Sequence, residues 1–154
     1  MNEHATLAQF LNNKVAMTTL AAWFIAQTIK VVLGVIKEKR FNFKWFVGTG
    51  GMPSSHAAGV IALVTSVGLQ VGVGSPLFAL ALLFTIVVLC DAQGVRWSTG
   101  KQAEILNRIM DDIYFKKKIQ EDRLKELVGH TPIQVLAGML IGLTVALMSY
   151  SGLK

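Results

Sequence analysis

The chain has 154 residues, of which 53% are hydrophobic and only 16% are charged. Its mean hydropathy of +0.52 and its low charge exclude an ordinary soluble domain. The net charge of +6 comes without the mixture of basic and aromatic residues that binds single strands, so we expect no nucleic-acid partner. We predict a single all-α domain over residues 1–154, an integral membrane helical bundle of about four transmembrane helices plus one amphipathic cytoplasmic helix.

Four apolar stretches predict the spans, in chain order residues 15–36, 57–73, 76–92 and 133–150. A bilayer core needs ~20 apolar residues in a helix and tolerates roughly 17 to 25. The first and last stretches fit well, whereas the middle two are short enough to be buried helices instead. The first stretch is too long for a signal peptide. The single cysteine, Cys90, excludes an internal disulfide and is expected to pack in the third stretch.

The loops differ in charge. Residues 37–56 and 91–131 fall on one side of the membrane, and they hold most of the lysines and arginines. The short turn at 72–75 and both termini fall on the other side. The positive-inside rule therefore places the two basic loops in the cytoplasm.

The second loop contains the expected amphipathic helix, at residues 99–118. Ser98 and Thr99 can cap its start, and Ile105, Ile109 and Ile113 form an apolar stripe at helical spacing. Charged residues fill the opposite face. We expect this helix to lie at the membrane surface or over the bundle.

The most informative segment is Gly-Gly-Met-Pro-Ser-Ser-His at residues 50–56, just before the second span. The glycines let backbone N–H groups approach a ligand. Ser54 or Ser55 can cap the helix, which leaves free N–H groups and the positive end of the helix dipole at the same place. The segment predicts an anion site that contains His56.

A second helix start carries a histidine as well. Thr131 and Gln134 form a capping-box pattern and Pro132 occupies the first helical position, directly after His130. A satisfied interfacial histidine is the simple interpretation of either residue alone. Two of them on one side of the membrane favour a shared site.

Two further clusters place polar groups near these histidines. Gln27, Lys30, Gly34 and Lys37 recur on one face of the first helix. Ionisable groups within a span usually mark a functional site. Snorkelling to the interface explains Lys37 alone, but it explains Lys30 less well, because Lys30 lies about two turns deeper.

The third span ends in a polar segment, where the expected helix C-terminus disfavours Asp91. Arg96 is the nearest compensating cation. The pair is either a site component or an interfacial ion pair that contributes little.

Together these clusters suit a phosphate group. Cations and N–H groups hold the oxygens, one imidazole attacks phosphorus, and a second protonates the leaving oxygen. A metal site is disfavoured because the histidines lack a cysteine or carboxylate at ligand spacing and lie among lysines. No cofactor is expected.

Three sequence motifs of the chain resemble those of one superfamily. Pro-Ser-Ser-His at 53–56, Gly-His-Thr-Pro at 129–132, and Lys30 followed by Lys37 resemble the motifs of the type-2 phosphatidic acid phosphatases, which are related to vanadium haloperoxidases. With Asp-Ala-Gln-Gly-Val-Arg at 91–96, the chain is most similar to the small divergent bacterial and plant branch. The resemblance implies a bacterial cell-membrane protein in which His130 forms a phosphohistidine and His56 protonates the leaving group. Lys30, Lys37 and the amides after Pro53 would hold the phosphoryl oxygens, without a metal.

The chain departs from that pattern in three ways. Leu124 stands where the superfamily has an arginine, which leaves Lys125 or Arg123 as the substitute, and Gln134 replaces an orienting aspartate. Asp91 or Glu126 are the candidates to support the histidine instead. The usual members also have six spans rather than four.

The sequence thus predicts a metal-independent membrane phosphatase that hydrolyses a lipid phosphate monoester or pyrophosphate. The alternatives are a non-catalytic binder or transporter of anionic lipid headgroups, and a scaffold that acts through its amphipathic helix. The expected partners are the bilayer and the lipid phosphate. Glycines such as Gly138 and Gly142 permit a homo-oligomer. We expect phosphate contacts from the following residues: Lys30, Lys37, Ser54, Ser55, Arg96 and Lys125.

Overall fold

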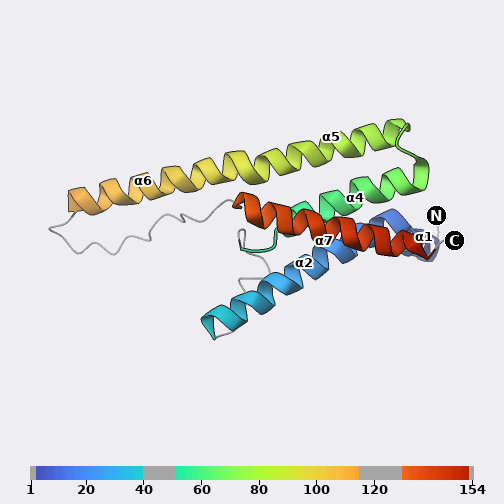
Figure 1. The fold of residues 1–154 in the computed structure, drawn as a ribbon, viewed down its shortest axis with the longest axis horizontal. Coiled ribbons are helices and arrows are strands. Elements are labelled where there is room, and N and C mark those ends of the chain that lie inside the picture. Colours follow the sequence, from blue (N-terminus) through green and yellow to red (C-terminus); the bar gives the residue numbers. More distant parts are fainter. Residues whose placement is uncertain (1–2, 40–50, 115–129, 153–154) are drawn as a thin grey trace.

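Every element of the part of the chain that the structure describes is helical, as the sequence predicts (Figure 1). The structure is a computed structural model, and it describes residues 3–39, 51–114 and 130–152. The helices, in chain order, are α1 (Glu3–Leu11), α2 (Lys14–Glu38), α4 (Ser55–Val71), α5 (Pro76–Cys90), the π-helical turn η1 (Asp91–Val95), α6 (Arg96–Tyr114) and α7 (Pro132–Ser151).

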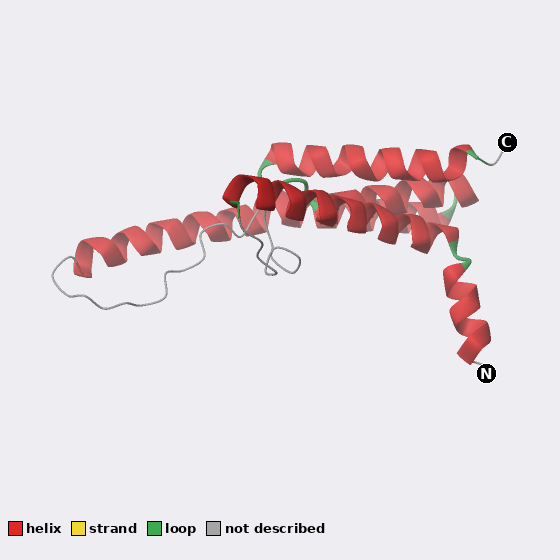
Figure 2. Cartoon of the chain, turned by 90° about the horizontal axis from the view of Figure 1, so that it is seen from below, coloured by secondary structure: helices red, strands yellow, loops and turns green. Residues whose placement is uncertain are grey.

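Helix α4 lies at the centre of the bundle, where it packs against α2, α5 and α7, and α2 also packs against α7. Fully buried alanines set the close approach of three of these helices, with Ala22 of α2, Ala62 of α4 and Ala146 of α7 in one cluster. Helix α1 turns away from the bundle, at the end where α7 finishes (Figure 2). Small side chains at the crossing points therefore allow a compact bundle with few large core residues.

The contact between α4 and α7 is the tightest in the bundle. A Cβ on Gly138 would overlap the carbonyl oxygen of Ser54, and a Cβ on Gly142 would overlap that of Ala58. The Ser54 N–H also donates to the Gln134 carbonyl at 3.0 Å. Since both sets of residue numbers rise together along the contact, α4 and α7 run parallel and begin side by side.

Helix α5 covers another face of α4. The Thr85 hydroxyl donates to the Val60 carbonyl at 3.1 Å, and Val64, Val67 and Ala81 form a small apolar cluster between the two helices. The turn from α4 to α5 uses Gly72 at φ +87°. Most other large side chains of α5 are exposed apolar residues, as expected for a surface that faces lipid.

Three helices are long and apolar enough to cross a membrane: Lys14–Glu38, the continuous rod Pro76–Met110, and Pro132–Ser151. Helix α4 is a shorter apolar helix of 17 residues. About half of its residues are buried by its neighbours, and its length is at the short end of the range for a membrane span, as the sequence indicates. The chain is thus an all-α helical membrane bundle.

The structure corrects the expected boundary between the third span and the amphipathic helix. Instead of ending at residue 92 and restarting at a Ser98–Thr99 cap, the helix runs from Pro76 through η1 into α6 without a break. No proline interrupts this stretch, and the widened π-helical turn accommodates Gly94 inside the rod. Residues 115–118 of the expected helix lie outside the described residues.

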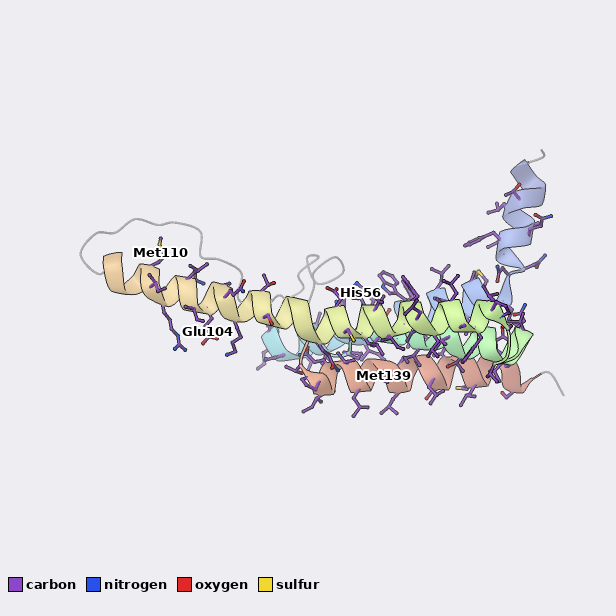
Figure 3. The ribbon with its side chains drawn as sticks, turned by 90° about the horizontal axis from the view of Figure 1, so that it is seen from above. His56, Glu104, Met110 and Met139 are labelled. Carbon is purple, nitrogen blue, oxygen red and sulfur yellow. The ribbon has the colours of Figure 1, made fainter. Side chains whose placement is uncertain are left out.

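The direction of α6 also differs from the expectation. It continues the axis of α5 past the end of the bundle, rather than folding over it (Figure 1). The side chains of Glu104 and Met110 project from opposite sides of this extension, beyond the other helices (Figure 3). Lys101 and Arg108 both form ion pairs with Glu104, at 2.9 and 2.7 Å. The helix is amphipathic, as its sequence indicates.

We expect Gly138→Ala to destabilise the protein, because the added methyl group overlaps the Ser54 carbonyl and forces α4 and α7 apart. Overpacking of this kind costs about 1–3 kcal/mol. The measurement is the unfolding temperature of the purified protein in detergent. Gly74→Ala is the matched control, since a Cβ at Gly74 meets nothing within 4 Å. Equal unfolding temperatures for the two variants would contradict the close packing.

Candidate functional site

Two parallel helices begin next to each other at one end of the bundle. Ser54 is the N-cap of α4, and Thr131 is the N-cap of α7 with both hydrogen bonds of a capping box. The N–H groups in the first turn of a helix have no backbone acceptor within that helix, and each cap hydroxyl here accepts from one of them, Ala57 in α4 and Gln134 in α7. Two positive dipole ends therefore point to the same region, an arrangement that favours an anion there.

The two histidines meet at this end. The ring centroids of His56 and His130 are 6.3 Å apart, with the ring planes inclined by 56°. His56 is exposed and projects from the first turn of α4, whereas His130 is only 4% exposed. Figure 3 marks His56 among the side chains of the bundle. Residues 74 positions apart in the sequence thus form one imidazole pair with a buried and an accessible member.

Hydrogen bonds to two different segments hold His130 in place. Its backbone N–H donates to the Ala92 carbonyl in η1 at 3.3 Å. Its Nδ1 lies 3.2 Å from Oε1 of Gln134, and the same oxygen accepts from the Thr131 N–H at 3.1 Å. Because a backbone N–H only donates, the shared atom of Gln134 is an oxygen. Nδ1 of His130 is then the donor, and in the neutral ring Nε2 is the nitrogen without a proton.

Lys30 lies beside the loop that leads to His56. It is 9% exposed within α2, and a Cβ on Gly51 would lie only 3.1 Å from its Cδ. Gly51 itself has φ +86°, which favours glycine at this position. The lysine stem therefore packs against the chain five residues before His56.

Lys37 is separated from this group. It is exposed near the end of α2, about two turns beyond Lys30, where α2 extends past the starts of α4 and α7 (Figure 1). The common face expected for the two lysines is therefore buried at Lys30 and solvent-accessible at Lys37.

The two serines have different surroundings. Ser54 is fully buried, and its hydroxyl accepts from the Ala57 N–H at 3.3 Å while its own N–H bonds to Gln134. Ser54 is therefore the cap that the sequence predicts, and helix packing uses both its N–H and its hydroxyl. Ser55 is 3% exposed at the first position of α4, so the predicted phosphate contact of the serines rests on Ser55.

Asp91 does not lie at a helix C-terminus, because the helix continues through η1. The prediction that the helix dipole disfavours the charge of Asp91 is therefore wrong. Its side chain is half-buried. Arg96 begins α6, one residue after η1. Lys125, Arg123, Leu124 and Glu126 lie outside the described residues, so their site roles stay predictions.

Sequence reasoning missed the part played by η1. In a regular α-helix a carbonyl binds the N–H four residues on, whereas the widened turn places the Ala92 carbonyl against the His130 N–H. The Asp-Ala-Gln-Gly-Val-Arg string marks the position, but nothing in it specifies a π-helical turn. Within the described ranges, no three His, Cys, Asp or Glu side chains cluster as metal ligands.

The family model described as the Divergent PAP2 family matches residues 11–145. The chain belongs to this family. It is also 38% identical over 151 residues to the uncharacterized membrane protein YuiD of Bacillus subtilis (strain 168), an alignment that covers 91% of this chain and 96% of YuiD. No solved structure matches the chain. The resemblance of the chain to the divergent branch is thereby confirmed, and the chain is a member of a phosphatase-related family of integral membrane proteins.

We expect Ser54→Ala to lower stability by about 0.5–2 kcal/mol, the usual cost of removing an N-cap oxygen. Ser98→Ala makes the same chemical change at an exposed position inside α6, where alanine favours a helix, and is expected to leave stability unchanged. Thermal unfolding in detergent compares the two. A loss at Ser98 equal to that at Ser54 would show that a helix starts there after all.

Proposed function

We propose that the protein is a membrane phosphatase that hydrolyses a lipid phosphate monoester or pyrophosphate through a phosphohistidine intermediate, without a metal ion. The observation that carries this proposal is the pairing of His56 with a buried, oriented His130, at 6.3 Å between centroids. The adjoining helix N-termini and Lys30 supply positive charge. Membership of a phosphatase-related family supports the reaction class.

The first half of the reaction transfers the phosphoryl group to the protein. Nε2 of His130 attacks phosphorus, and the bond between phosphorus and the leaving oxygen breaks. The imidazolium of His56 donates its proton to that oxygen, which departs as an alcohol or a phosphate. Lys30 and the first-turn amides of α4 stabilise the charge on the three remaining oxygens.

The second half returns both histidines to their starting states. His56, now neutral, takes a proton from a water molecule as the oxygen of that water attacks phosphorus. The bond between phosphorus and Nε2 of His130 breaks, and inorganic phosphate leaves. An exposed His56 fits this role, because it must reach both the leaving group and water.

The position of the site along the bundle favours a lipid substrate. At the opposite end, Tyr150 donates to Gln70 at 2.7 Å, and the Lys14 ammonium lies 4.4 Å from the Tyr150 ring centroid. Such amphipathic residues mark a membrane interface. The 17 residues of α4 between the two polar ends span about 25 Å, close to a hydrocarbon core of ~30 Å.

The histidine pair then lies at headgroup depth in one leaflet, where a lipid phosphate would reside. We propose that this leaflet faces the cytoplasm of a bacterial cell, because the basic loops flank the site.

The decisive experiment measures phosphate release from phosphatidic acid by the purified protein in detergent. We expect His130→Ala to lower the rate by roughly 10³-fold or more, as for other single nucleophile losses. We expect His56→Ala to lower it by about 10²–10⁴-fold. His4→Ala in α1 is the matched control. Acid-labile, base-stable phosphate on the wild-type protein, and its absence from His130→Ala, would identify the intermediate.

Equal phosphate release by wild type and His130→Ala would overturn the proposal. The replacement of the orienting aspartate by Gln134 favours a second function, a non-catalytic binder or transporter of anionic lipid headgroups. Phosphatidic acid that binds tightly and is recovered intact would indicate this function instead.

We expect Gln134→Glu to raise the turnover rate about fivefold to tenfold, because a charge-assisted hydrogen bond to the imidazolium is about 1 kcal/mol stronger than a neutral one. The carboxylate still accepts from the Thr131 N–H, so the helix cap is kept. Gln70→Glu is the matched control, since Gln70 lies at the opposite end of the bundle and accepts from Tyr150. Lower activity in Gln134→Glu would contradict the orienting role of this side chain.

A further inference from the structure

The contact between α2 and α4 has a definite register. Gly59 of α4 lies against Trp23 of α2, and Gly51, just before α4, lies against Lys30. From Trp23 to Lys30 the residue numbers rise along α2, while the residues they contact fall from Gly59 to Gly51. The two segments therefore run antiparallel. One turn beyond the Trp23–Gly59 contact therefore brings Gln27 opposite Ser55.

The side-chain directions agree with this register. Residues four apart on a helix share a face, so Gln27 lies on the face of Trp23, and Ser55 lies on the face of Gly59. Gln27 is 2% exposed and Ser55 is 3% exposed. A buried amide thus faces α4 at the level where that helix begins, one residue from His56.

Gln27 is a buried polar residue within a membrane-spanning helix. Buried amides in proteins are hydrogen-bonded, and polar groups within membrane spans usually serve a site. Gln27 and Lys30 are one turn apart on the same face of α2, and both are buried. An amide has two N–H donors, which suit an oxyanion between Lys30 and the histidine pair.

We propose that Gln27 is a substrate-binding residue, which donates hydrogen bonds from its side-chain amide to an oxygen of the phosphate held beside Ser55, Lys30 and His56. The inference rests on the proposed function for its ligand, and it adds a contact from the interior of the membrane bundle. The substrate phosphate would then lie between α2 and the first turn of α4, with Gln27 on its buried side.

The test uses two substitutions at Gln27. Gln27→Met keeps the unbranched shape and removes the donors, while Gln27→Glu puts a negative charge in the same place. We measure the binding of orthovanadate, a tetrahedral oxyanion, by calorimetry, and the hydrolysis of dioctanoyl phosphatidic acid. We expect Gln27→Met to weaken vanadate binding and raise KM by about 10-fold or more, as for a hydrogen bond to a charged group.

Gln27→Glu separates a phosphate contact from a purely structural role. If Gln27 faces the phosphate, the carboxylate repels it, and Gln27→Glu binds vanadate more weakly than Gln27→Met. If Gln27 only supports Lys30, the carboxylate pairs with the ammonium, and Gln27→Glu binds vanadate at least as well as Gln27→Met, which would overturn the inference. If Gln27→Met folds poorly, Gln27→Glu is compared with wild type instead. Weaker vanadate binding by Gln27→Glu then supports the inference, and equal or tighter binding overturns it.

Thr18→Val is the matched control, because Thr18 is a buried polar residue of the same helix, 5% exposed and far from the histidines. It is expected to keep wild-type KM and vanadate affinity. Equal losses in Thr18→Val and Gln27→Met would overturn the inference, since the effect would then come from helix packing.

The outcomes distinguish this inference from the proposed function. If the wild type hydrolyses the lipid and Gln27→Met does so equally well, the inference on Gln27 is overturned and the proposed function stands. If the wild type binds vanadate but releases no phosphate, and Gln27→Met weakens that binding, catalysis is overturned and the Gln27 contact is supported. A wild type that neither binds vanadate nor hydrolyses the lipid would overturn both.

Discussion

The close contact between the first halves of α4 and α7 is the constraint on which the site depends. Gly138 and Gly142 are four residues apart, and each lies beneath a backbone carbonyl of α4. This spacing of small residues lets two membrane helices approach to backbone contact. Because the helices are parallel, the same contact aligns their N-termini and brings His56 to His130. Packing and site geometry are thus consequences of one interface.

The sequence predicts much of this arrangement from local signals. The Ser54 cap and the capping box at Thr131 follow from residue types at fixed offsets, and they depend on bonds within a few residues, so a pattern is sufficient to find them. The shared end of the two histidines follows from the order of the apolar spans along the chain. For Lys37 the sequence leaves both a site role and snorkelling open, because its exposure depends on where α2 passes the starts of α4 and α7. The buried position of Lys30 agrees with the prediction that it faces the interior.

The continuous rod from α5 to α6 shows why element boundaries are harder to predict. Ser98 and Thr99 have the chemistry of a helix start, and Asp-Ala-Gln-Gly looks like a helix end, yet the helix passes through both. The tertiary contact explains the outcome. The π-helical turn lets the Ala92 carbonyl meet the His130 N–H, an interaction between segments 38 residues apart that no local pattern contains.

The different environments of the two imidazoles favour the division of roles that we propose. A nucleophile needs a fixed tautomer and direction, and His130 has both through Gln134 and the η1 carbonyl. A residue that first donates a proton and later accepts one must reach the leaving group and water, which suits the exposed His56. An amide in place of a carboxylate beside His130 keeps the orientation but stabilises the imidazolium less. This substitution therefore favours slow turnover over a loss of site geometry.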